Sequence, residues 1–147
     1  MQGVLVFLHI LAATVWTGGH LVLATVVLPK VLRERSPEML HSFESAYERT
    51  GIPALIVQVV TGFWLAYQLV PDVGQWFDFD NPLSRPIAAK IALLIITILF
   101  ALDARLRLIP NLSRDNLNAM AWHIVPVTII SVLFVFVGVA FRTGWLY

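Results

Sequence analysis

Four long apolar runs, separated by short polar segments, dominate the hydrophobic pattern of this chain. They cover about residues 3–28, 52–70, 87–102 and 119–141. Each is close to the ~20 residues that an α-helix needs to cross the hydrocarbon core of a bilayer. The pattern therefore predicts an all-α integral membrane protein. We expect a four-helix bundle with up-down-up-down connections, forming a single domain over residues 1–147.

A different pattern precedes the second run. Ser36, Pro37 and Glu38 are typical of a helix start, with a capping hydroxyl, a proline in the first turn and an acid behind it. Residues 38–50 then alternate apolar and charged positions, which is typical of an interfacial helix. We expect a short amphipathic helix that leads into the second span, with a bend or a short break at Pro53.

Composition strengthens the membrane assignment and narrows the chemistry. The chain is 59% hydrophobic and 13% charged, whereas soluble proteins are about 25% charged. It has no cysteine, which excludes disulfides, thiolate metal sites, iron–sulfur clusters and covalently attached haem. A net charge of +1, with the basic residues at helix ends, gives no sign of nucleic-acid binding. The first run lacks a basic segment and a cleavage site, so we expect a retained span.

Basic residues are unequally distributed between the connecting segments. The segment after the second run holds Arg85 among three aspartates, whereas those after the first and third runs hold Lys30, Arg33, Arg35, Arg49, Arg105, Arg107 and Arg114. Because basic loops stay in the cytoplasm, this bias predicts that both termini lie outside. In a bacterial inner membrane, outside means the periplasm.

Two histidines lie in the first run, and each calls for a partner because ionisable groups are costly within a bilayer. His9 and His20 are eleven residues apart, which places both imidazoles on one face of a helix about 16 Å apart. Ala13, Trp16 and Thr17 lie between them. The small residue leaves room for a flat group, and the tryptophan provides a wall for it.

The other candidate residues come from the third and fourth runs. By depth, Lys90 and Arg142 share a layer with His9, where their charges suit the propionates of a haem. His123 lies near the cytoplasmic end of the fourth run. The metal-ligand candidates are therefore His9, His20 and His123, and the cofactor-binding candidates are Trp16, Lys90 and Arg142.

Three functions fit these residues. Two imidazoles from facing helices are typical axial ligands of haem b, so our leading prediction is a haem b protein for electron transfer or quinol-linked redox chemistry. Its expected partners are the lipid bilayer and a quinone or periplasmic redox protein.

The alternative is copper binding or transport, with ligands in Met39, His41, Met120 and His123, because imidazole and thioether suit Cu(I). The third is a structural or assembly subunit whose histidines bond to neighbouring groups. The sequence leaves enzymatic activity and homo-oligomers open.

Short motifs in three of the spans are similar to known families. They are Leu8-His9-Ile10-Leu11-Ala12-Ala13 followed by Trp16-Thr17-Gly18-Gly19, then Lys90-Ile91-Ala92-Leu93-Leu94, and Gly138-Val139-Ala140-Phe141-Arg142. With these motifs the chain resembles the copper-resistance protein D (CopD) family of bacterial membrane domains. It is more distantly similar to the HemJ family of protoporphyrinogen oxidases, which bind haem b. The resemblance implies a four-helix bundle of the inner membrane in which His9, with Lys90 close by, is the functional position of the first span.

Overall fold

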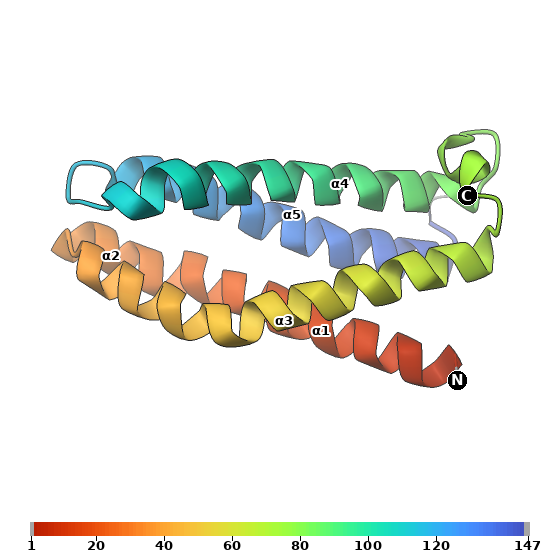
Figure 1. The fold of residues 1–147 in the computed structure, drawn as a ribbon, viewed down its shortest axis with the longest axis horizontal. Helices are drawn as coiled ribbons and strands as arrows, with labels where there is room; N and C mark the ends of the chain where they lie inside the picture. Colours follow the sequence, from red (N-terminus) through yellow and green to blue (C-terminus); the bar gives the residue numbers. More distant parts are fainter. Residues whose placement is uncertain (1, 146–147) are drawn as a thin grey trace.

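This computed structural model describes residues 2–145, which form four long helices, and Figure 1 shows how these helices are arranged. The helices that are long and apolar enough to cross a membrane are Gln2–Glu34, Pro37–Leu69, Ser84–Asn111 and Leu117–Thr143. No strand occurs between residues 2 and 145. The predicted fold class is therefore confirmed. Residue 1 and residues 146–147, which the predicted domain includes, lie outside the described part.

Two of the long helices contain π-helical turns. The first consists of α1 (Gln2–Val22), the π-helical turn η1 (Leu23–Val27) and α2 (Leu28–Glu34). The third consists of α4 (Ser84–Asp103), the π-helical turn η3 (Ala104–Leu108) and the 3₁₀ turn η4 (Ile109–Asn111). The second is α3 (Pro37–Leu69), the fourth is α5 (Leu117–Thr143), and η2 (Val73–Phe77) is a 3₁₀ turn between α3 and α4. These helices extend beyond the apolar runs because their charged ends remain helical.

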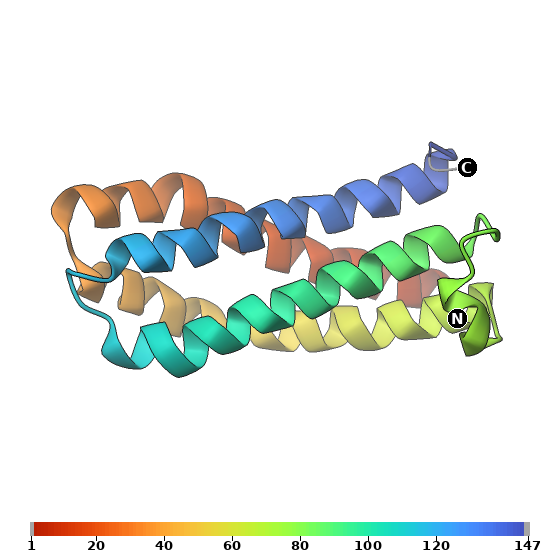
Figure 2. The same ribbon diagram turned by 90° about the horizontal axis from the view of Figure 1, so that it is seen from above.

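The helices alternate in direction along one long axis (Figures 1 and 2). Residue 2, the segment around η2 and the end of α5 lie together at what we call the termini end. The turn from α2 to α3 and the segment from η4 to α5 lie at the other end, called here the arginine-rich end. Helix α1 packs on α3 and α5, and α4 packs on α5.

The amphipathic segment and the second span form one continuous helix. Ser36 caps α3 by accepting a hydrogen bond from the Met39 backbone N–H (3.3 Å). The helix then continues through Pro53, and Figure 1 shows it curving along its length. The expected amphipathic helix leads into the second span without interruption, and of the bend or short break expected at Pro53 the bend is observed. A proline removes one backbone hydrogen bond, which a helix can absorb by bending.

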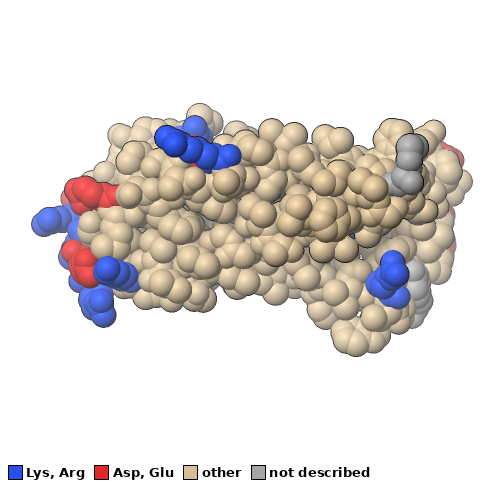
Figure 3. Space-filling model, turned by 90° about the horizontal axis from the view of Figure 1, so that it is seen from below, with Lys and Arg blue, Asp and Glu red and all other residues tan. Residues whose placement is uncertain are grey.

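Buried apolar side chains gather at the arginine-rich end. The cluster joins η1, α2, α3, η3 and α5 through Leu23, Leu28, Val31, Leu40, Leu108, Leu117, Met120 and Ile124. On the face drawn in Figure 3, charged side chains lie toward the two ends and leave an uncharged band between them. Much of the apolar surface of the four helices is exposed, as expected where lipid is the solvent.

Helices α1 and α3 approach each other closely around one tyrosine. The Tyr47 ring lies where Gly19 of α1 and Gly51 of α3 have no side chain. A Cβ atom at Gly19 would lie 2.1 Å from the Tyr47 ring, and one at Gly51 would lie 2.8 Å from it. The absence of side chains at both glycines therefore makes room for the tyrosine between the two helices.

Adding a methyl group at Gly19 should destabilise the protein, because Tyr47 must move to accommodate it. We expect Gly19→Ala to cost about 1–3 kcal/mol, the usual range for overpacking. Thermal unfolding in detergent measures the loss. Gly18→Ala is the matched control, since nothing lies within 4 Å of a Cβ there. In a Tyr47→Ala background the cost of Gly19→Ala should largely disappear, and an unchanged cost would contradict the proposed contact.

Candidate functional site

Both histidines of α1 face α3, and each lies in its own polar layer. In the layer nearer the termini end, His9 Nδ1 is 2.9 Å from Thr61 Oγ1. The Thr61 hydroxyl donates its single proton to the Val57 carbonyl (2.6 Å), so it accepts from the His9 Nδ1–H. Gly62 lies beside the ring, and a Cβ there would be 3.1 Å from His9 Cε1.

The second layer surrounds His20, which is 8% exposed. Its Nδ1 is 2.9 Å from the Trp16 carbonyl oxygen one turn earlier. The Trp16 and His20 rings are 4.3 Å apart between centroids. Tyr47 lies edge-on to His20 and donates its hydroxyl to the Trp16 carbonyl (3.0 Å). Across the bundle, the Thr128 hydroxyl lies 3.2 Å from the His20 carbonyl oxygen, while its proton goes to the Ile124 carbonyl of its own helix (2.7 Å).

These contacts indicate the tautomer of both rings. A carbonyl, or a hydroxyl whose proton is already used, can only accept, so each Nδ1 carries a proton. In the neutral ring, Nε2 then carries the lone pair. An imidazole whose Nδ1–H is held by an internal acceptor is the typical form of a histidine that binds a metal through Nε2.

Lys90 lies in the His9 layer, as its depth in the sequence predicts. Its ammonium lies 3.4 Å from the position of a Cβ at Gly138 of α5, and it is close enough to act electrostatically on His9. Arg142 is exposed in the last turn of α5, and Trp16 borders His20 instead of His9. The structure therefore brings Lys90 to His9 and Trp16 to His20.

His123 has different neighbours. Its Nδ1 is 2.9 Å from the Ala119 carbonyl oxygen, and its Nε2 is 2.6 Å from Asp103 Oδ2 of α4. The Phe100 ring packs edge-on against it. Both ring nitrogens are therefore engaged, and the contact with Asp103 ties α4 to α5.

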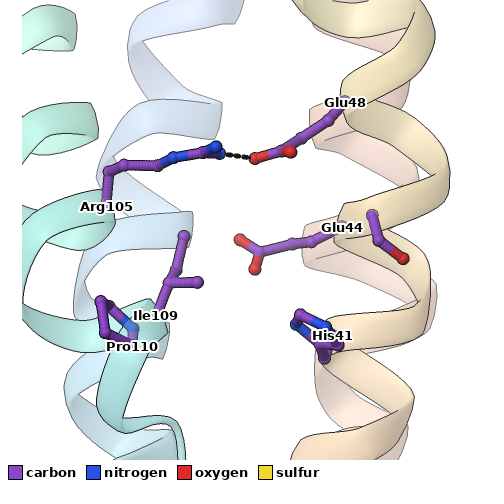
Figure 4. A pocket seen from close by; sticks show the side chains of 7 residues that line it. His41, Glu44, Glu48, Arg105, Ile109 and Pro110 are labelled. Atoms are coloured by element: carbon purple, nitrogen blue, oxygen red, sulfur yellow. Dashed lines mark hydrogen bonds and ion pairs between the residues drawn. The ribbon is translucent and has the colours of Figure 1, made fainter.

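The methionines considered for copper lie at the arginine-rich end. Met120 is buried in the apolar cluster there, and Met39 packs against the same cluster. His41 is exposed and lines a hollow of about 230 Å³ between α3 and the end of the third helix. Figure 4 shows His41 and Glu44 on one side of this hollow and Arg105, which pairs with Glu48, on the other.

Residues 2–145 contain no group of three or more His, Cys, Asp or Glu side chains placed to hold a metal ion. Sequence reasoning missed Tyr47 and Asp103, the partners of two predicted ligands. Tyr47 lies in a segment whose pattern indicates the membrane interface. Asp103 is a charged residue at a helix end, and no sequence pattern links it to His123.

The tautomers can be tested by nitrogen NMR of histidine-labelled protein in lipid bilayers at mildly alkaline pH. We expect His9 and His20 to carry a proton on Nδ1 and none on Nε2. In Thr61→Val the His9 acceptor is lost with little change of volume, so the Nε2–H form of His9 should increase while His20 stays unchanged. A wild-type His9 protonated on Nε2 alone would contradict the hydrogen bond to Thr61.

A comparison with family models gives one match, to copper resistance protein D, over residues 41–142. A search of curated proteins and a search of solved structures gave no match. The matched segment includes Tyr47, Thr61, Lys90 and His123, whereas His9 and His20 lie before it. Since 102 of the 147 residues lie inside the match, this membrane protein belongs to the copper resistance protein D (CopD) family.

Proposed function

We propose that this protein binds copper within the membrane and conducts it along the bundle axis, with His20 as the central ligand. Membership of a copper-resistance family supports copper as the substrate. The observation that carries the proposal is the buried His20 ring, whose Nδ1–H is held by the Trp16 carbonyl. The neutral ring thereby has its Nε2 lone pair for a metal.

The charge around each histidine favours His20 over His9. A cation at His9 would meet the Lys90 ammonium in the same layer, and like charges repel strongly where the dielectric is low. The interactions described around His20 involve no Lys or Arg side chain. Its neighbour Trp16 instead offers an indole face, which attracts cations.

Soft donors continue from His20 toward the arginine-rich end. Met120 belongs to the apolar cluster and Met39 packs against it. His41 is exposed two residues after Met39 on α3. Thioether and imidazole are suitable ligands for Cu(I). We propose that copper passes along these side chains.

A site that offers only a few ligands is suitable for an ion that is transported and not retained. Conduction requires that a site bind strongly enough to admit an ion and weakly enough to release it. A resident metal would instead require a closed set of ligands, and no group of three His, Cys, Asp or Glu occurs in the described part of the chain.

The comparisons support the copper alternative and give no support to haem b, electron transfer or an oxidoreductase. The contacts explain why the spacing of the histidines in the sequence does not translate into a pair of haem ligands on facing helices. His9 and His20 lie on one helix, and His123 on the facing helix is held by Asp103.

The charge bias leads us to propose that the arginine-rich end lies in the cytoplasm of a bacterial inner membrane. Copper would then pass from the His20 layer toward His41 and the cytoplasm.

Replacing the central ligand should abolish tight copper binding. We expect His20→Phe, which keeps a flat ring without nitrogen, to weaken Cu(I) binding by about tenfold or more. The measurement is competition with a chelator of known affinity, using protein in lipid nanodiscs under reducing conditions.

The matched control is His123→Gln, which should bind copper like the wild type because both nitrogens of His123 are engaged by the protein. Loss of copper in His123→Gln and full retention in His20→Phe would overturn the proposed site. Wild-type protein that binds no copper would leave the structural or assembly role as the better reading.

A further inference from the structure

Lys90 has a positive charge inside the membrane without a carboxylate to balance it. Its ammonium lies between α4 and α5, beside Gly138. No ion pair to it is found between residues 2 and 145. The acidic residues of the chain all lie in the segment 72–80 or toward the arginine-rich end. An unpaired charge within a bilayer is costly, so it points to a partner from outside the chain.

Two acceptors in the same layer also lack donors. Gln58 Oε1 is buried and has no hydrogen-bond partner among the described residues. Gln58 lies one turn before Thr61 on α3, and its backbone carbonyl interacts with His9. The second acceptor is His9 Nε2, which carries the lone pair once Nδ1–H is given to Thr61.

These three groups define what a ligand must bring. It needs an oxygen that accepts from the Lys90 ammonium and hydroxyl protons for Gln58 Oε1 and His9 Nε2. A phosphodiester or an ionised carboxylate offers acceptors alone. A hydroquinone has two hydroxyl groups, each both donor and acceptor, on a flat apolar ring that dissolves in lipid.

We propose that the layer formed by His9, Gln58 and Lys90 binds the head of a membrane hydroquinone. The ring would enter from the lipid, because His9 and Lys90 are only partly buried. Gly62 and Gly138 border the two side chains without adding bulk. The proposal is independent of copper, which we assign to the His20 layer.

The test is equilibrium binding of radiolabelled decylubiquinol to the full chain in phosphatidylcholine nanodiscs, with empty nanodiscs as background. We expect saturable binding with one molecule per chain. Lys90→Met should weaken it about tenfold or more, because a charge-assisted hydrogen bond is lost. His9→Phe should have a comparable effect. Lys30→Met, at the only other lysine, should leave binding unchanged.

A second variant separates ligand binding from a structural role of these side chains. Gly62→Ala removes no polar group, but its Cβ would lie 3.1 Å from His9 Cε1 and so displaces the ring. We expect weaker hydroquinone binding with unchanged copper binding and thermal stability.

Three results would overturn the proposal. They are binding no greater than to empty nanodiscs, equal affinity in Lys90→Met, and displacement of the hydroquinone by phosphatidylglycerol, which would make a lipid phosphate the occupant. None of them depends on copper, so the hydroquinone site and the copper site can fail separately.

Discussion

A polar side chain in lipid has to find its hydrogen-bond partner inside the protein, and this constraint organises the bundle. Most threonines of the spans meet it locally by donating to the carbonyl four residues earlier, as Thr14, Thr25, Thr61, Thr97, Thr128 and Thr143 do. His20 and His123 use the same carbonyl position. Gln58 and Lys90 differ from these residues. Gln58 Oε1 has no hydrogen-bond partner among the described residues, and the Lys90 ammonium has no ion pair there.

Side chains of helix α3 contact the surroundings of both α1 histidines. Near its start, Tyr47 reaches the Trp16 carbonyl and the His20 ring, and further along the same helix Thr61 holds His9. Because α3 is one continuous helix, a change in its tilt would act on both layers together. Helix α5 contributes separately, through Thr128 at His20 and Gly138 at Lys90.

The sequence predicted the helices and the depth of their polar residues better than their contacts. Apolar runs identify spans because a bilayer demands a minimum length, and counting residues along the spans placed Lys90 with His9. The helix ends were underestimated, since charged residues such as Glu34 and Asp103 remain helical. Contacts between helices depend on how each one is rotated about its axis. That is why the links from Asp103 to His123 and from Tyr47 to His20 could not be predicted.

The π-helical turn η1 separates the polar and apolar parts of the first long helix. The buried residues Thr17, His20 and Leu23 follow each other in steps of three, and the next one, Leu28, comes five residues later. The Leu28 backbone N–H bonds to the Leu23 carbonyl across η1, so this five-residue step makes about one turn and shifts the inward-facing register by one residue relative to a regular α-helix. Residues before this turn can therefore be oriented for α3 and its chemistry, while those after it are oriented for the apolar cluster. The polar layers and the apolar cluster are therefore served by one helix in two registers that are offset by one residue.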